Sequence, residues 1–442
     1  MNINDKYFCV VPFVQLNTRG KGDARVCCSI SGIDFGIPKD RTLNTVNAGE
    51  YDATTPVYNL GEDTIQELWN SDFMRDFRMK MIQGEHIPNC EFCHRMEASG
   101  LTSKRITKNK KFLDKVLPLL EQYKKDKGYV EAMPQWWEIR LSTKCNLSCI
   151  MCSPNLSSMM FKEYSKWERE GTASNYMKGS LIIAKDSGEE YLSKSEFFKE
   201  QVLDNLEHAV FMEFRGGEVF ADRDSIEFIR AITETEHAKN ITLDISTNAT
   251  LITDEVVDIL NKFKGGILRF SIDAYGDEDE LIRYHTDWNT VKECMLRCNK
   301  LKKGFRFLSQ TTVQSANCTT LNKLIEFFDD FIQVNKYDRF DFGFTTVRGK
   351  DWMRHEMIPN SLRDKAIKKL KTLKTSLYIC INHKKANSFC ESIDMLISTL
   401  KAPEYPRSDL HRQAIEFYNT LSQQRDVNYY EKFPCLESLR NE

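Results

Sequence analysis

Three cysteines in the eight-residue stretch CNLSCIMC, namely Cys145, Cys149 and Cys152, constrain this chain more than any other feature. The stretch follows the strand-like run WWEIRLSTK and precedes the amphipathic run NLSSMMFKEYSKWERE, so we expect a loop between a strand and a helix. A structural zinc site takes four ligands and a disulfide takes two cysteines, whereas three thiolates can hold three irons of a [4Fe–4S] cluster and leave the fourth iron open. The alternatives are a zinc site that a distant fourth ligand completes and a buried structural cluster of thiols.

The cysteine content of the whole chain bears on the same question. The 442 residues include 14 cysteines and carry a net charge of −2. The N-terminus MNINDKYFCVVPF has no basic region followed by a long apolar run, and no stretch has the length of apolar residues that a membrane helix needs. We therefore predict a cytoplasmic protein. In that reducing compartment closely spaced thiols favour metal binding over disulfides.

The chain divides into four predicted parts. Residues 1–110 form a cysteine-rich module, residues 111–132 a linker helix, residues 133–350 a barrel domain and residues 351–442 a C-terminal helical region. Within the third part, strand-like runs alternate with helical patterns, and these runs are WWEIRLS, AVFMEFRGG, NITLDIST, GILRFSID, FRFLSQTTVQ and RFDFGFTTV. Such alternation predicts an α/β fold with a partial (β/α)6 TIM-type barrel.

Polar residues and glycines follow these strands, at the ends where barrel enzymes place their chemistry. FRGGEVF supplies Gly216, Gly217 and Glu218, where the glycines would let the backbone approach a ligand and the carboxylate could accept from an ammonium. The later strands supply Ser246 and Asn248, Ser271 and Asp273, then Gln314 and Asn317, with Arg283 in DELIRYHTD. Each of these motifs alone is also typical of ordinary turns and loop caps.

Taken together, the C-x3-C-x2-C spacing and the order of these motifs resemble the radical S-adenosylmethionine (radical SAM) superfamily over about residues 135–350. Met151 stands where that family commonly has an aromatic residue. The resemblance implies that Cys145, Cys149 and Cys152 hold a [4Fe–4S] cluster whose open iron binds SAM. It also implies that Glu218 contacts the SAM amino group and Arg283 its carboxylate. The serine, asparagine and aspartate residues would meet the ribose or the carboxylate side of SAM.

The N-terminal cysteines resemble the auxiliary-cluster modules called SPASM and twitch domains. Gly22 and Cys27 match a G-x4-C element, with Cys9 before it and Cys90 and Cys93 after it. This resemblance implies an auxiliary [4Fe–4S] cluster bound by Cys9, Cys27, Cys90 and Cys93, although the module usually follows the barrel. Two alternatives stay open: Cys28 could replace Cys27, and a zinc ribbon would use the same four thiols.

The remaining cysteines and the nearby histidines are expected to be structural. His86 and His94 flank the C-x2-C motif, but loop histidines beside such motifs are more often not ligands. The cysteines without a ligand pattern are Cys294, Cys298, Cys318, Cys380, Cys390 and Cys435.

The resemblance implies reductive cleavage of SAM to a 5′-deoxyadenosyl radical that abstracts hydrogen from a substrate, with a flavodoxin or ferredoxin as electron donor. We expect a small-molecule or peptide substrate, with the auxiliary cluster aiding oxidation or positioning. A leader-binding winged helix is not expected before Cys9. The alternative is an enzyme that modifies nucleosides or nucleic acid, which the near-neutral charge does not favour. The basic runs at residues 104–111 and 365–374 are the features that could support it.

Overall fold

The computed structural model describes residues 6–20, 22–30, 37–39, 56–98, 102–185, 191–381, 386–406 and 408–440. All residues proposed above as ligands or cofactor contacts lie within these ranges. The chain forms two compact units: unit 1 comprises residues 1–142, 189–216 and 223–244, and unit 2 comprises residues 143–188, 217–222 and 245–442.

The sheet of unit 1 combines strands from the cysteine-rich part with strands predicted for the barrel. Its order is β5 (Phe211–Arg215), β3 (Trp136–Arg140), β1 (Gln15–Thr18) and β2 (Ala24–Arg25). β1, β3 and β5 are parallel, and only β2 runs antiparallel to its neighbour. The register places Glu138 of β3 opposite both Asn17 of β1 and Glu213 of β5. Side chains alternate along a strand, so these three polar residues share one face of the sheet.

Helix α5 (Lys104–Val116) packs on that face of the unit 1 sheet, because Phe112 stacks on Trp136 with ring centroids 5.7 Å apart. The Ser103 side chain caps its first turn by accepting from the backbone N–H of Ile106. The helix therefore begins earlier than the predicted linker helix. Pro118 lies in the 3-10 turn Leu117–Leu119 that separates α5 from α6 (Leu120–Lys125), and its ring cannot donate a backbone hydrogen bond.

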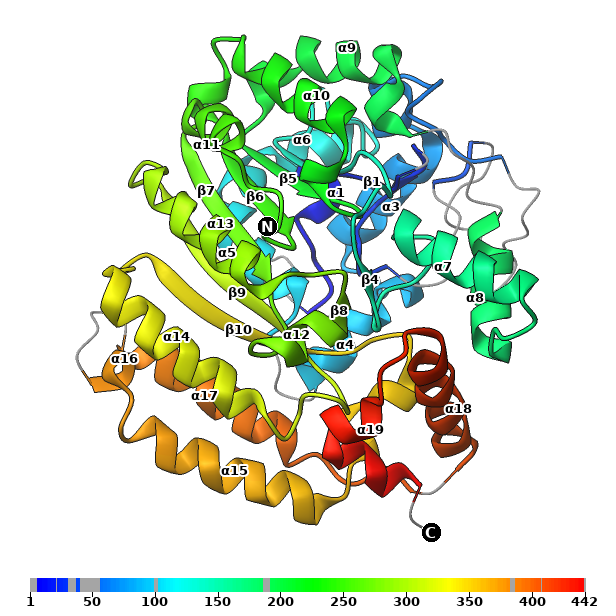
Figure 1. Cartoon of the computed structure of the whole chain (residues 1–442). Coiled ribbons are helices and arrows are strands. Elements are labelled where there is room, and N and C mark those ends of the chain that lie inside the picture. The colour runs from blue at the N-terminus through cyan, green and yellow to red at the C-terminus, as the bar shows by residue number, and fades with distance from the viewer. Residues whose placement is uncertain are drawn as a thin grey trace. The chain divides into compact units, whose positions relative to one another are not determined.

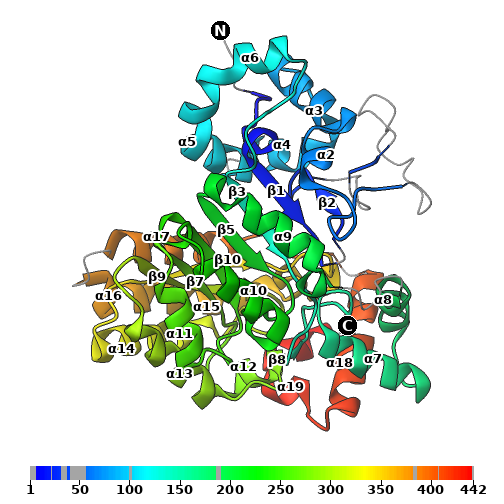
Figure 2. The same cartoon turned by 90° about the horizontal axis from the view of Figure 1, so that it is seen from above.

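The other helices of unit 1 complete its layers. They are α1 (Val11–Val14), α2 (Ile65–Trp69), α3 (Asp72–Gln83), α4 (Glu91–Ala98), α9 (Glu196–Asp204) and α10 (Arg223–Thr233). Figure 2 shows α3, α4, α5 and α6 grouped around β1.

Unit 2 contains the later barrel strands. Its parallel order is β10 (Phe340–Thr346), β9 (Phe305–Val313) and β7 (Gly265–Ser271), while β6 (Thr242–Thr247) is divided between the two units. A separate antiparallel ladder joins β4 (Ser148–Cys149) to β8 (Arg283–Tyr284). All six strands predicted for the partial barrel are present, and the α/β class is confirmed.

Helices surround the strands of unit 2 and make up its C-terminal part. They are α7 (Ser158–Arg169), α8 (Asn175–Lys185), α11 (Asp254–Asn261), α12 (Asp277–Ile282), α13 (Trp288–Arg297), α14 (Leu321–Asn335), α15 (Asn360–Lys374), α16 (Tyr378–Ile381), α17 (Ala386–Leu400), α18 (Asp409–Gln424) and α19 (Tyr429–Lys432). In Figure 1, α14, α15 and α17 lie together beside β10. Among the described residues, none of these helices has both the length and the apolar character of a membrane span.

Candidate functional site

The three-cysteine loop lies in unit 2 and is fixed by its own backbone. The Cys152 N–H donates to the Cys149 carbonyl oxygen at 2.9 Å, and Cys149 pairs with Arg283 in the β4–β8 ladder. Burial raises the pKa of the Cys145 thiol to about 11, and burial raises that of Cys149 further; the neighbouring thiols add to both shifts. Two thiols with raised pKa values in one loop stay protonated unless a positively charged group such as iron stabilises their thiolates, which fits an iron–sulfur cluster.

Two cations that the sequence analysis did not single out hold this loop. The Lys350 ammonium, which is 3% exposed, donates to the carbonyl oxygens of Ile150 at 2.7 Å and Cys152 at 2.6 Å. Arg425, just after α18, donates to the Ser148 carbonyl at 2.8 Å and pairs with Glu163 at 2.7 Å. These cations lie some 200 or more positions from the loop in sequence, so no local pattern could have identified them.

The two glycines of the Gly-Gly-Glu motif pack against the backbone of residues 142–144. A Cβ atom at Gly216 would lie 2.5 Å from the Ser142 carbonyl oxygen, and one at Gly217 would lie 2.3 Å from that of Lys144. Each glycine is therefore required because backbone segments approach closely, and not only by a ligand.

The Glu218 carboxylate is buried and linked to the end of β6. It accepts hydrogen bonds from the Asn248 N–H at 2.6 Å and from the Thr247 hydroxyl at 2.9 Å. Burial raises the pKa of Glu218 to about 7, and these hydrogen bonds oppose the shift. The predicted contacts Glu218 and Asn248 thus lie side by side.

Asp273 and Arg283 form a buried ion pair with an N–O distance of 2.7 Å. The same guanidinium lies 3.7 Å from the Cys149 sulfur, so it connects the strand-end carboxylate to the cysteine loop. Asp279 accepts from the Asp273 N–H at 2.7 Å, and burial raises its pKa to about 7. Arg283 therefore faces two carboxylates and a predicted cluster ligand.

Gln314 differs from the other predicted contacts because its side chain is fully buried and has no partner. Neither its amide nitrogen nor its amide oxygen makes a hydrogen bond within the described part of the chain. Ser246 lies on β6 and Ser271 on β7, both half-buried. Buried polar atoms are nearly always paired, so the free amide of Gln314 fits a place that a cofactor occupies.

A second set of thiols lines one cavity in unit 1. Cys9, Cys27, Cys90 and Cys93 all contribute to its wall, together with Lys104 and Arg105. Burial raises the pKa of Cys9 to about 12, and the Cys93 thiol contributes to the shift. Cys28 does not line the cavity and is exposed. The four cysteines grouped by the sequence thus line one cavity, and Cys28 is not among its lining residues.

Residues of helix α5 connect the segments that form the wall of this cavity. Arg105 donates to the Phe8 carbonyl at 3.1 Å and pairs with Glu97 of α4, so it links the segment before Cys9 to the helix that carries Cys93. Asn109 also donates to the Phe8 carbonyl, at 2.9 Å.

His86 and His94 contact Tyr7, which lines the cavity, and are not lining residues themselves. Within the residues that the structure describes, no three His, Cys, Asp or Glu side chains are arranged to hold a single metal ion.

The structure also pairs cysteines that showed no pattern in the sequence. The Cys318 and Cys435 thiols both donate to the Ser315 carbonyl, at 3.6 and 3.2 Å, and burial together with the neighbouring Cys390 thiol raises the pKa of Cys380 to about 12. Cys294 donates to the Ile252 carbonyl, which is the role of a buried structural thiol. None of these cysteines lines the cavity of the N-terminal thiols.

Comparison with protein families gives two matches. Residues 139–314 match the Radical SAM superfamily, and residues 9–95 match SPASM, an iron–sulfur cluster-binding domain. The two regions contain all seven cysteines proposed as cluster ligands. A radical SAM domain implies a [4Fe–4S] cluster and SAM, and a SPASM domain implies auxiliary iron–sulfur binding, so the predicted cofactors are confirmed.

Similar solved structures include anSMEcpe with bound AdoMet and Kp18Cys peptide, at 20% identity and a TM-score of 0.35. The match covers 53% of this chain and 57% of that chain, so it spans little more than half the length of anSMEcpe. SuiB of Streptococcus suis bound to precursor peptide SuiA matches at 18% identity and a TM-score of 0.34, over 75% of this chain and 68% of that one.

TYW1 with a lysine-pyruvate adduct matches at 18% identity and a TM-score of 0.30, over 54% of this chain and 71% of that one. A comparison with proteins of curated function gives no match. From the two family matches, the chain carries a radical SAM domain with a SPASM iron–sulfur cluster-binding domain on its N-terminal side.

Proposed function

We propose that this protein is a radical SAM enzyme that removes a hydrogen atom from a small-molecule or peptide substrate. Its SPASM domain would hold an auxiliary [4Fe–4S] cluster that aids oxidation or positioning of the substrate. The observation that carries the proposal is the presence of two separate thiol sets, one of three in the loop at residues 145–152 and one of four around a single cavity. When bound, the loop cluster and SAM supply the electron and the radical that abstracts hydrogen.

The residues of this chain would bind and orient SAM. The free amide of Gln314 is the best-supported contact, because a buried amide without a partner is costly unless a ligand pairs with it. Glu218 and Asn248 lie side by side at the end of β6, where an ammonium or a hydroxyl could bind. Arg283, held by Asp273, presents a cation beside Cys149 that suits a carboxylate. Ser246, Ser271, Gly216 and Gly217 complete the proposed set.

Lys350 and Arg425 would keep the cluster loop in one conformation. Each donates to loop carbonyl oxygens, and Lys350 also interacts electrostatically with the Cys149 and Cys152 thiols. Hydrogen bonds and charges around the ligands influence the reduction potential of an iron–sulfur cluster. The proposal places the enzyme in the cytoplasm, where a flavodoxin or ferredoxin would deliver the electron.

Two lysines of the first basic run are not available for the nucleic-acid alternative. Lys104 and Lys108 of the first basic run are paired with Glu138 and Glu213 on the sheet beneath them. Paired lysines do not provide a free phosphate-binding surface. The check is binding to RNA and DNA as a function of salt. Tight binding at about 150 mM salt with a steep negative slope would favour the alternative.

The experiment that tests the proposed function is anaerobic reconstitution followed by addition of SAM and dithionite. The protein should form 5′-deoxyadenosine and methionine, and Cys149→Ala should form neither. Cys294→Ala is the matched control, because Cys294 is also buried but bonds to the Ile252 carbonyl. Cleavage of SAM by Cys149→Ala at the rate of the control would contradict the proposal.

A further inference from the structure

One lysine of α5 lies between the four-cysteine cavity and a buried carboxylate of β3. Lys104 lines the cavity together with Cys27. Its ammonium is 3.0 Å from the Cys28 sulfur and 2.8 Å from a carboxylate oxygen of Glu138. Lys104 therefore lines the cavity and at the same time pairs with Glu138 of the sheet.

The Lys104–Glu138 pair is shielded from water. The side chains are 16% and 6% exposed, respectively. Gln15 of β1 donates its amide N–H to the same Glu138 oxygen at 2.7 Å, which fixes the carboxylate. Charges in such surroundings act on their neighbours more strongly than surface charges, because solvent screens them less.

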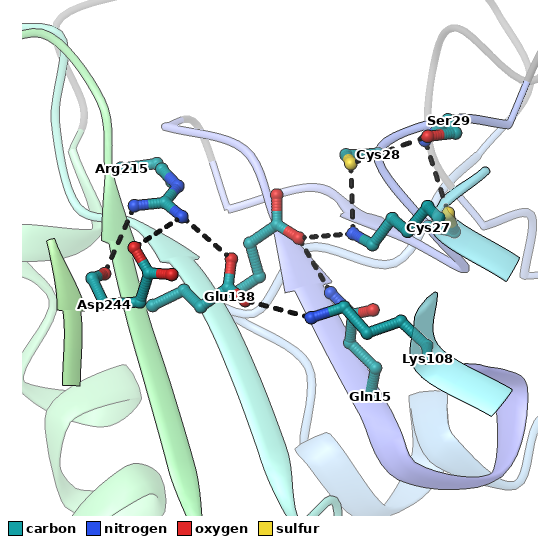
Figure 3. A network of polar contacts seen from close by, with 10 residues as sticks. Gln15, Cys27, Cys28, Ser29, Lys108, Glu138, Arg215 and Asp244 are labelled. Atoms are coloured by element: carbon teal, nitrogen blue, oxygen red, sulfur yellow. Dashed lines mark hydrogen bonds and ion pairs between the residues drawn. The ribbon is translucent and has the colours of Figure 1, made fainter. Parts of the chain in front are cut away.

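A second pair of the same kind lies one helical turn along α5. Lys108 is 3.4 Å from Glu213, and their side chains are 16% and 13% exposed. Glu213 stands opposite Glu138 in the β3–β5 register and also pairs with Arg215 at 3.1 Å. Figure 3 shows how Arg215 continues this second pair to Asp244. Lys108 does not line the cavity, so it has the same helix and sheet surroundings as Lys104 but a different relation to the thiols.

We propose that the Lys104–Glu138 pair sets the reduction potential of the auxiliary cluster, with Lys104 raising the potential and Glu138 lowering it. This inference rests on the proposed auxiliary cluster. Reduction adds one negative charge to a cluster, so a nearby cation stabilises the reduced form and a nearby anion destabilises it. Lys104 lines the cavity, whereas Glu138 does not and reaches it only through Lys104. The lysine therefore has the larger effect on the reduction potential.

The test uses the full chain with Cys145, Cys149 and Cys152 changed to Ala, so that any remaining cluster is the auxiliary one. Redox titration followed by electron paramagnetic resonance gives its midpoint potential. In this background Lys104→Gln should disfavour one-electron reduction by at least about tenfold, which is a fall of about 59 mV. Glu138→Gln should raise the potential by a smaller amount, because Gln keeps an acceptor for Gln15 while losing the charge.

The double variant Lys104→Gln with Glu138→Gln leaves no unpaired buried charge, so it protects the test against misfolding of a single variant. Its potential should lie between the wild-type value and that of Lys104→Gln. Lys108→Gln and Glu213→Gln are the matched controls, and each should shift the potential less than its counterpart at the first pair.

Three results would overturn the inference. Unchanged potentials in Lys104→Gln and the double variant, with the cluster present, would refute it and leave the proposed function intact. Shifts as large in Lys108→Gln would mean that any cation of α5 acts equally. A background protein without an iron–sulfur cluster would refute both the inference and the auxiliary cluster on which it rests.

Discussion

The ammonium of Lys350 donates a hydrogen bond to the carbonyl oxygen of Cys152 at 2.6 Å, at the end of the three-cysteine loop. The same ammonium donates to the Ile150 carbonyl oxygen, so one buried side chain satisfies two carbonyl groups, one between the second and third cysteines and one on the third. The loop conformation therefore depends on a residue that follows the last barrel strand.

Replacing Lys350 by Met should make the loop cluster labile. The change leaves two buried carbonyl groups without a donor, each costing about 1–3 kcal/mol. Release of iron to a chelator should become faster for about half of the iron, and the rate of SAM cleavage should fall. Lys374→Met is the control, because Lys374 pairs with the exposed Asp394 on the surface. Equal iron release from the two variants would show that Lys350 does not hold the loop.

The four-cysteine cavity should be separable from SAM cleavage. Cys93→Ala should lose about four irons and still cleave SAM, because the two thiol sets share no ligand. Iron analysis and 5′-deoxyadenosine formation check this on one sample. Loss of SAM cleavage to the level of Cys149→Ala would instead mean that the cavity has only a structural role.

Cys27 and Cys28 should differ in their effect on iron content. Cys27 lines the cavity, whereas the Cys28 sulfur meets Lys104. Cys27→Ala should lose about four irons, and Cys28→Ala should retain about eight. Iron and sulfide analysis after reconstitution measures both. The opposite result would make Cys28 the ligand.

Gln314→Leu should weaken SAM binding without loss of iron. Leu has a similar size but cannot form hydrogen bonds, so a cofactor that pairs with the amide loses those bonds. Calorimetric titration of SAM into the reconstituted protein should show affinity reduced by about tenfold, given 1–1.5 kcal/mol for a lost hydrogen bond. Unchanged affinity would remove Gln314 from the proposed contacts.

The sequence was sufficient for the parts of the fold with local signals. Three predicted barrel strands, β5, β6 and β9, show the alternation of a half-buried strand, as β9 does with Phe305 and Phe307 on its buried face. β3 differs because four consecutive residues, Trp136 to Ile139, are buried. The cysteine loop and the Cys90/Cys93 pair are also local patterns of fixed spacing, and both fall within matched domains.

Other features could not be predicted because they join distant parts of the chain. Lys350 and Arg425 reach the loop from far along the sequence, and nothing in their neighbours indicates it. The basic run at residues 104–111 was a feature that could support nucleic-acid binding, but the register of β3 and β5 places Glu138 and Glu213 beneath Lys104 and Lys108. Cys318 and Cys435 are also far apart in the sequence and come together only through tertiary packing.

The central claim is that one chain carries a SAM-cleaving cluster on Cys145, Cys149 and Cys152 and a second cluster on other thiols. The most direct measurement compares iron content and 5′-deoxyadenosine formation in the wild type and in the variant with all three cysteines changed to Ala. We predict about eight irons with SAM cleavage in the wild type, and about four irons with no cleavage in the variant. Formation of 5′-deoxyadenosine by the triple variant would contradict the account.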